Sequence, residues 1–335
     1  MPACPQIGEG QEKLMPRPSS THLSQAPPRR TVPARIGQGA EMMQKQGIRR
    51  RLQVAALVLA GAASAAAWAG PPADWTTPIK PFHIVDNIYY VGSEGLAAYL
   101  IVSEQGAILL DAPLAANADQ IERNIESLGV PLHDVRLLLS SHAHADHVGA
   151  MAALKRDTGA RYAASAGDRW ALENGRNQGD NNYGIQPFDP IKLDEVVSDG
   201  QKLRLGDVEL TAHLTPGHTA GCTSWSMTVN DRGTPREVLF LCSITVAGNT
   251  LVGNRSYPTI AEDFRATFAK LGAMQADIVL SGHPDTTGIL ERQAQRADGD
   301  EDAFVDPDLL ARLVDAHKES FEDALSKARS TPQRP

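Results

Sequence analysis

An apolar segment that runs directly into a cluster of histidines constrains this chain more than any other feature. Leu137, Leu138 and Leu139 precede two serines, and the cluster is His142-Ala143-His144-Ala145-Asp146-His147. The apolar segment predicts a short buried strand, and a helix is expected to begin at the end of the cluster. Alternate residues of an extended chain point the same way, so His142 and His144 can reach a common point. Asp146 and His147 then face a neighbouring point.

Two more histidines follow predicted strands. His218 stands in Pro216-Gly217-His218-Thr219, and His283 stands in Ser281-Gly282-His283-Pro284. The glycines permit tight turns and close approach of the backbone. Imidazole and carboxylate groups are the usual ligands of zinc. Five histidines and one aspartate are enough for two Zn²⁺ ions that keep positions open for water. The remaining histidines are expected to be structural or exposed to solvent: His22, His83, His133, His213 and His317.

The order of the predicted elements indicates the fold class. The alternating run His83–Val91 predicts a strand, and the strands expected after it are 98–102, 107–110, 135–139, 161–164, 191–196, 207–214, 223–229, 237–242 and 277–280. Helices are expected at 116–129, 147–155, 260–273, 285–296 and 306–327. The strands between 191 and 242 have no helix among them, which disfavours a doubly wound parallel sheet. We therefore expect an α/β (α+β) fold with two facing sheets and helices outside, in a single domain over residues 70–335.

Charge limits the partners. The 335-residue chain has a net charge of −8, and residues 1–69 hold nine basic and three acidic side chains, so residues 70–335 carry −14. An acidic surface repels the phosphate backbone, which excludes nucleic acid as a partner.

The first 69 residues predict export. Arg49-Arg50-Arg51 precedes an apolar run over 52–69 that ends in Ala67-Trp68-Ala69, as in a cleaved secretory signal peptide. The alternative is an uncleaved membrane anchor, which the alanine-rich composition disfavours. We interpret 42–69 as the signal peptide and 1–41 as a non-native or disordered leader. The mature protein is then expected in the periplasm, without stable membrane association. Export also permits a disulfide between Cys222 and Cys242.

The histidine motifs resemble those of the metallo-β-lactamase superfamily. The resemblance rests on His142-x-His144-x-Asp146-His147, Gly217-His218-Thr219 and Gly282-His283-Pro284, and it spans about residues 80–325. It implies an αβ/βα four-layer sandwich with two zinc ions at one edge of the sheets. By this resemblance His142, His144 and His218 bind the first zinc, and Asp146, His147 and His283 bind the second.

A later segment narrows the resemblance to the third subclass (B3) of the class B β-lactamases. Glyoxalase II, lactonases and RNase Z place a metal-bridging Asp near the strand that ends at Cys242, and this chain has no Asp between Val238 and Asp263. Ser243 matches the third subclass, which has no Cys ligand here. Ser243 and Thr245 are then candidates to bind the substrate carboxylate, with strand capping as the alternative. Cys222 and Cys242 are expected on adjacent strands, as a disulfide or as two buried thiols.

The resemblance implies hydrolysis of the β-lactam amide of penicillins, cephalosporins and carbapenems by a zinc-bound hydroxide, which Asp146 helps to orient. The expected substrate is a small molecule, and a monomer is expected. Two alternatives stay open at this point. One is another dizinc hydrolase, acting on a lactone or thioester, and the other is a periplasmic zinc-binding protein without catalysis.

Overall fold

The computed structural model describes residues 71–330, which belong to one unit spanning Ala67–Pro335. The predicted leader (1–41) and signal peptide (42–69) lie outside the described residues, so both stay predictions. Among the described residues, no helix combines the length and apolar character needed to cross a membrane.

The first sheet has seven strands in the order β1-β2-β3-β4-β5-β6-β7. The strands are β1 (Phe82–Val85), β2 (Ile88–Tyr90), β3 (Tyr99–Ser103), β4 (Gly106–Leu110), β5 (Val135–Leu139), β6 (Arg161–Ser165) and β7 (Glu195–Val197). Neighbours are antiparallel from β1 to β4 and parallel from β4 to β7. The parallel part requires crossover connections, and each of the three contains at least one helix.

The second sheet has five strands in the order β12-β11-β10-β9-β8. They are β8 (Lys202–Leu205), β9 (Val208–Leu214), β10 (Thr223–Asp231), β11 (Thr234–Leu241) and β12 (Ile278–Ser281). Only the β11–β12 pair is parallel.

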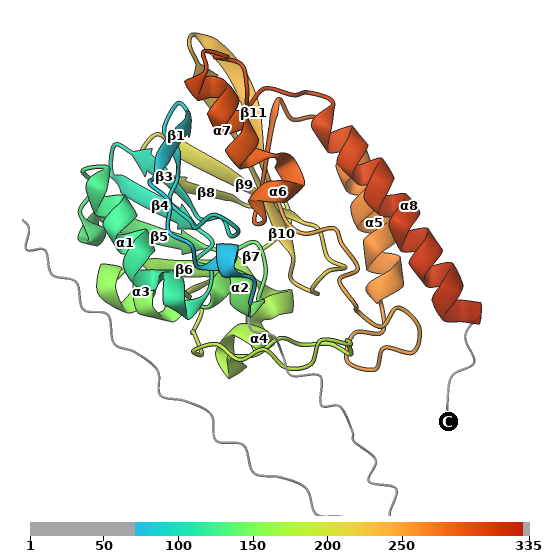
Figure 1. Cartoon of the computed structure of the whole chain (residues 1–335). Helices are drawn as coiled ribbons and strands as arrows, with labels where there is room; N and C mark the ends of the chain where they lie inside the picture. Colours follow the sequence, from blue (N-terminus) through green and yellow to red (C-terminus); the bar gives the residue numbers. More distant parts are fainter. Residues whose placement is uncertain (1–70, 331–335) are drawn as a thin grey trace, which may run out of the picture. The chain divides into compact units, whose positions relative to one another are not determined.

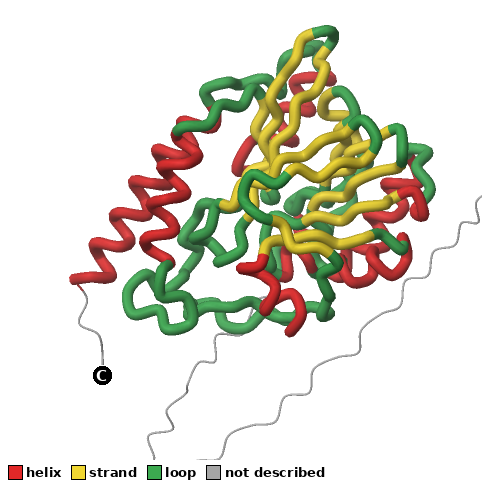
Figure 2. Tube along the Cα trace, turned by 180° about the vertical axis from the view of Figure 1, so that it is seen from behind, coloured by secondary structure: helices red, strands yellow, loops and turns green. Residues whose placement is uncertain are grey.

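Three apolar layers hold the four-layer sandwich together, and Figures 1 and 2 show the two sheets with helices on their outer sides. Side chains alternate along the strands of the first sheet, because successive residues of a strand point to opposite faces. On β5, for example, Leu137 and Leu139 enter the core between the sheets. Leu138 instead packs toward α1 (Ala118–Ser127) and α3 (Met151–Thr158) on the outer face. The third layer lies between the second sheet and helices α5 (Ile260–Gly272) and α8 (Leu309–Ser330).

The helices continue the sandwich outward. They are α1 (Ala118–Ser127), α2 (Ala145–Val148), α3 (Met151–Thr158), α4 (Arg169–Asn174), α5 (Ile260–Gly272), α6 (Pro284–Thr287), α7 (Ile289–Ala297) and α8 (Leu309–Ser330). Phe264 of α5 and Phe321 of α8 pack with their rings tilted and the ring centroids 5.1 Å apart, and both are fully buried. This contact fixes α8 along α5 at the right of Figure 1.

The structure confirms the expected sandwich and corrects several predicted elements. The run His83–Val91 is a hairpin rather than one strand, because Asp86 adopts a left-handed conformation (φ 48°) and turns the chain. The strand predicted at 191–196 is reduced to β7, and β8 was missed. The helices predicted at 147–155 and 285–296 are each two shorter helices.

Candidate metal centre

The six predicted ligands come from four segments that meet at one end of the two sheets. His142 and His144 follow β5, and Asp146 and His147 lie in the short helix α2. In the second sheet, His218 follows β9 and His283 follows β12. Residues separated by up to 141 positions in the chain therefore converge, which the spacing of the motifs alone could not establish.

Three histidines form the first group. The ligand atoms of His142, His144 and His218 lie within 4.8 Å of one another. His218 Nε2 is 3.2 Å from His144 Nδ1, and all three side chains are buried. This geometry suits one small cation among three imidazoles.

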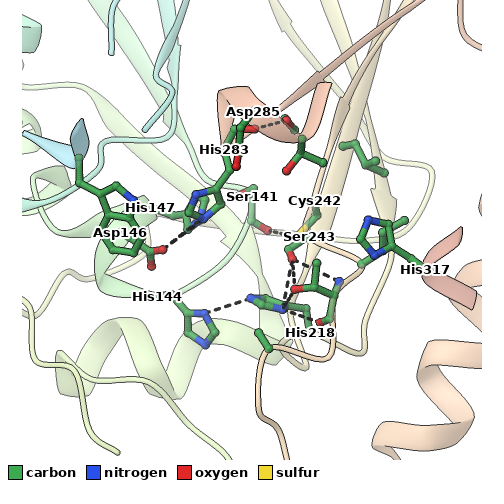
Figure 3. Close-up of a pocket in the computed structure, with 18 of the residues that line it drawn as sticks. Ser141, His144, Asp146, His147, His218, Cys242, Ser243, His283, Asp285 and His317 are labelled. Carbon is green, nitrogen blue, oxygen red and sulfur yellow. Dashed lines mark hydrogen bonds and ion pairs between the residues drawn. The ribbon is translucent and has the colours of Figure 1, made fainter. Parts of the chain in front are cut away.

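Asp146, His147 and His283 form the second group, and their ligand atoms also lie within 4.8 Å of one another. The Asp146 Oδ2 atom is 3.3 Å from His283 Nε2 and 3.7 Å from His147 Nε2. Figure 3 shows these three side chains gathered beside His144 and His218. Gly282 is required here, because a Cβ atom on it would lie 2.4 Å from the His147 ring.

Each of the four most buried histidines has one ring nitrogen occupied on the side away from the cluster. His218 Nδ1 donates to the Thr245 carbonyl at 2.8 Å, and His147 Nδ1 donates to Asp111 Oδ2 at 3.1 Å. His142 Nδ1 lies 3.1 Å from Ser141 Oγ, and His144 Nε2 lies 3.3 Å from Tyr183 Oη. The other nitrogen of each ring faces the cluster, which is the arrangement of metal-binding histidines.

The first group fits a cation by two further observations. His142 Nε2 is buried and has no hydrogen-bond partner among residues 71–330. Burial, with the neighbouring imidazoles, lowers the pKa of His142 well below its ordinary value. Burial similarly lowers the pKa of His144 to about 3 and that of His218 to about 4. The three rings are therefore neutral at pH 7 and offer lone pairs, as metal binding requires.

The second group carries the carboxylate charge. Burial alone would raise the pKa of Asp146, but His147 and His283 hold it below the usual range. Burial alone would lower the pKa of His147, but the carboxylates of Asp146 and Asp111 raise it. A cation bound here would be partly neutralised by Asp146, which favours its retention.

The motifs did not identify Asp111, which lies behind His147. Its carboxylate also accepts hydrogen bonds from Ser141 N at 2.6 Å and Ser141 Oγ at 2.8 Å. Its backbone is left-handed (φ 61°), which is costly for a residue other than glycine. The available signal was its place directly after the apolar strand β4, which is paired with β5.

A cavity of about 430 Å³ opens over the two groups. Ser243 and Thr245 line it beside His218, with Ser243 Oγ 3.2 Å from His218 Nδ1 and 3.0 Å from Thr245 Oγ1. Tyr183, whose hydroxyl lies 3.3 Å from His144 Nε2, also lines it. The histidine predicted to be structural or exposed on the last helix, His317, is half-buried and also lines the cavity (Figure 3).

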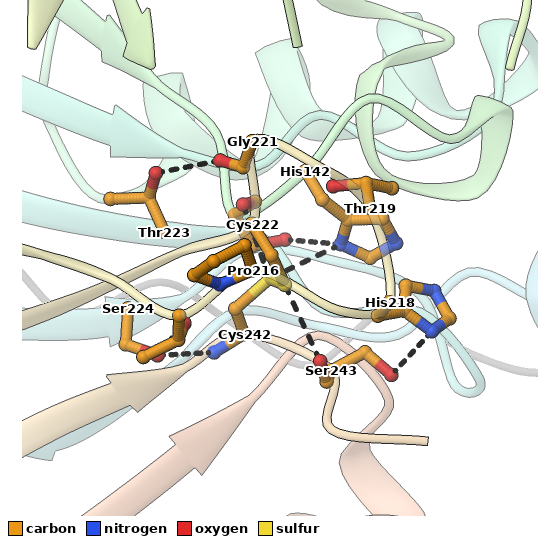
Figure 4. Close-up of a disulfide and its surroundings, with 12 residues drawn as sticks. His142, Pro216, His218, Thr219, Gly221, Cys222, Thr223, Ser224, Cys242 and Ser243 are labelled. Atoms are coloured by element: carbon orange, nitrogen blue, oxygen red, sulfur yellow. Dashed lines mark hydrogen bonds between the residues drawn. A yellow bond between two sulfur atoms is a disulfide. The ribbon is translucent and has the colours of Figure 1, made fainter. Parts of the chain in front are cut away.

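Cys222 and Cys242 are joined by a disulfide, with their Cα atoms 5.9 Å apart. Cys222 lies just before β10 and Cys242 just after β11, which are paired strands. Figure 4 shows the disulfide beside His142, and the Cys242 sulfur is 3.7 Å from His142 Nδ1. A disulfide offers no thiolate, so the two sulfurs do not act as metal ligands in this state.

Comparison with known proteins identifies the family. The family model of the metallo-beta-lactamase superfamily matches residues 96–283, which is more than half of the chain. The chain therefore belongs to the metallo-β-lactamase superfamily.

Similar solved structures include enzymes of subclass B3. A subclass B3 metallo-β-lactamase of Bradyrhizobium japonicum is 42% identical, with a TM-score of 0.72, over 77% of this chain and 98% of that chain. A metallo-β-lactamase from Legionella gormanii is 35% identical, with a TM-score of 0.72, over 76% of this chain and 98% of that one.

Relatives of another kind also match by sequence. A hydroxyacylglutathione hydrolase of Cereibacter sphaeroides is 28% identical over 44% of this chain and 48% of its own length. A probable metallo-hydrolase of Burkholderia pseudomallei is 32% identical over 34% of this chain and 37% of its own length. This chain thus spans less than half of the length of these two relatives.

Proposed function

We propose that this protein is a dizinc β-lactamase that hydrolyses the amide bond of β-lactam antibiotics in the periplasm. The observation that carries the proposal is the pair of ligand groups under one cavity, each with its ligand atoms within 4.8 Å of one another. Similarity to subclass B3 enzymes over nearly their whole length supports the substrate class.

The ligand sets differ in charge, and the difference suggests a division of labour. His142, His144 and His218 would hold one zinc with neutral ligands only, and Asp146, His147 and His283 would hold the other. Bound zinc supplies Lewis-acid chemistry, polarising a carbonyl and lowering the pKa of water from about 15.7 to about 7. The carboxylate of Asp146 lines the cavity, where it can accept a hydrogen bond from a water molecule and orient it.

Ser243 and Thr245 supply hydroxyl groups at the cavity wall. Their oxygens lie 3.0 Å apart beside His218, so a substrate carboxylate placed over them could accept a hydrogen bond from each. Tyr183 and His317 bound the same cavity and limit the shape of the substrate's side groups.

The test is hydrolysis of a chromogenic cephalosporin and of a carbapenem by the purified protein, with and without a zinc chelator. Turnover is expected, together with its loss in chelator and its recovery on adding zinc. His218→Asn should abolish most of the turnover. His213→Asn is the matched control, because His213 lies on β9 and bonds Ser226 outside the ligand groups. A protein that binds two zinc ions and leaves both substrates intact would refute the proposal.

Thioester hydrolysis is the second candidate, and the match to hydroxyacylglutathione hydrolases favours it. The absence of an Asp between Val238 and Asp263 in the sequence argues against it, because that activity is expected to use a metal-bridging aspartate there. A hydroxyacyl-glutathione thioester should therefore be assayed beside the β-lactams, and faster turnover of the thioester would reverse the order of the two candidates.

A further inference from the structure

Asp168 is a buried carboxylate that contacts both loops of the first ligand group without lining the cavity. It lies at the end of the 3-10 turn Ala166–Asp168 after β6 and is only 4% exposed. Its Oδ2 accepts hydrogen bonds from Ala143 N at 2.8 Å and from Thr219 Oγ1 at 3.2 Å, and its Oδ1 accepts one from Gly221 N at 3.0 Å. Ala143 stands between His142 and His144 in the sequence, and Thr219 directly follows His218.

The carboxylate of Asp168 accepts hydrogen bonds from these loops rather than from the helix that it precedes. Asp168 occupies the N-cap position of α4, where an aspartate side chain commonly accepts a hydrogen bond from the first turn. No such bond forms here. Burial raises the pKa of Asp168 to about 6, against the opposing effect of its three donors. The carboxyl group is therefore still mainly ionised at pH 7. A carboxylate only accepts hydrogen bonds, which suits a position surrounded by three donors.

The turn Ala166–Asp168 and the loop that carries His218 are also in tight contact. A Cβ atom on Gly221 would lie 2.4 Å from the Asp168 carboxyl carbon, and one on Gly167 would lie 2.2 Å from the Ala220 carbonyl oxygen. Ser165 Oγ donates to the Gly221 carbonyl at 2.6 Å. A displacement of the turn would therefore be passed to the loop that carries His218.

The ligands of the first group need such a connection because they come from different sheets. His142 and His144 follow β5 of the first sheet, and His218 follows β9 of the second, so no strand pairing sets their separation. The Thr223 N–Ser141 O hydrogen bond (2.8 Å) joins the two segments where the strands end. The Asp168 bonds join them beyond that point, at the residues next to His144 and His218.

We propose that Asp168 is a positioning residue that ties the His142–His144 loop to the His218 loop and so sets the spacing of the three imidazoles for a metal ion. This inference rests on the proposed binding of zinc at the first group, and it does not depend on which substrate the protein hydrolyses. Groups that orient metal ligands typically contribute about 10- to 100-fold to metal affinity.

The test compares Asp168→Asn with the wild-type protein by titrating the metal-free protein with zinc against a chromophoric chelator. Asparagine has the same size, but its NH₂ group would face an N–H or O–H donor. We expect one of the two binding steps to weaken by about 10- to 100-fold, with the other step little changed and the folded circular dichroism spectrum retained. Asp194→Asn is the matched control, because Asp194 also accepts a backbone hydrogen bond, from Tyr162 N at 2.8 Å, away from the ligands.

A second variant keeps the test decisive if Asp168→Asn does not fold. Thr219→Val removes one donor to Asp168 and leaves the carboxylate in place, and it should weaken the same step by a smaller factor. Folded variants that bind both ions with wild-type affinity would overturn the inference, as would a wild-type protein that binds no zinc. A wild-type protein that binds two ions with the expected Asp168 effect but hydrolyses no β-lactam would overturn only the proposed function.

Discussion

The candidate ligand imidazoles are bonded to groups behind them, and Asp111 behind His147 is a clear example. It is the only carboxylate among the described residues that bonds directly to a ring nitrogen of His147 on the side away from the cluster, and it also holds Ser141 next to His142. Loss of its charge would free the His147 ring to rotate and would change which nitrogen carries the proton.

Asp111→Asn is therefore expected to weaken zinc binding by about 10- to 100-fold, chiefly at the group of Asp146, His147 and His283. The measurement is the same chelator competition, followed by turnover at saturating zinc. Asp207→Asn is the control, since Asp207 accepts a backbone hydrogen bond from Glu104 on an exposed turn. Unchanged affinity in Asp111→Asn would show that packing against its neighbours, such as Gly282 and the His142 ring, holds the His147 ring without the Asp111 bond.

The six candidate ligands could be chosen from the sequence, but the residues behind them could not. Closely spaced histidines after an apolar strand mark a metal site locally, within a few positions of the chain. Asp111 and Tyr183 bond to candidate ligands 36 and 39 positions away, and Asp168 bonds to neighbours of such ligands 25 and 51 positions away. Their partners become visible only when β4, β5 and β6 are seen side by side. For the same reason His317, at the far end of the chain, was not recognised as part of the cavity.

At the scale of the elements, the β10–β11 hairpin carries part of the candidate site. A two-residue turn, Arg232-Gly233, closes its outer end, and both residues have positive φ, which matches the twist of a hairpin. The disulfide between Cys222 and Cys242 closes the opposite end, next to His142. The disulfide therefore holds β10 and β11 together at the end of the hairpin that lies beside the candidate ligands.

Removal of this disulfide by the double substitution Cys222→Ala and Cys242→Ala should lower the free energy of unfolding by about 3 kcal/mol, because the bond closes a loop of about 20 residues. Urea unfolding of the zinc-loaded proteins measures the difference. Reductant should destabilise the wild-type protein and leave the double variant unchanged. Equal stability of the two oxidised proteins would mean that the strand pairing alone holds the hairpin closed.

Strands were predicted correctly where the apolar pattern was bounded by polar residues. They were predicted wrongly where a turn lay inside an alternating run. The strand at 135–139 matches β5 in full, since it is apolar and bounded by polar residues. The alternation over His83–Val91 continues through the turn at Asp86-Asn87, so the sequence pattern alone could not separate β1 from β2. The hairpin is set by the left-handed backbone of Asp86, which the alternation of side chains does not reveal, and β2 then pairs with β3.

At the scale of the whole molecule, the convergence of ligands creates a stability that depends on pH when no metal is bound. An unperturbed histidine has a pKa near 6.5, whereas burial lowers the pKa values of His144 and His218 in the folded protein to about 3 and about 4. Between pH 6.5 and 4 these two histidines are therefore protonated in the unfolded chain but remain neutral in the folded chain. Stability is full above pH 6.5 and is lost as the pH falls through this window.

Other groups do not reverse this trend. Asp168 has the opposite sign, because burial raises its folded pKa from 3.8 to about 6, so it stabilises the fold at low pH and loses that contribution as the pH rises. The effect of Asp168 comes from one group, whereas three groups act in the opposite direction: His144, His218 and His142, whose pKa is also lowered. The pKa of His147 is raised, so its contribution to stability changes only above pH 6.5, outside this window.

We therefore expect the thermal midpoint of the chelator-treated protein to fall steadily from pH 7 to pH 4.5, before the bulk of the carboxylates titrate. The double variant His144→Gln and His218→Gln replaces two of these rings by neutral groups that cannot take up a proton, so its midpoint should fall less over the same range. His213→Gln supplies the control for replacing a half-buried histidine outside the cluster. Parallel curves for the wild-type protein and the double variant would show that these buried rings do not control the loss of stability in acid.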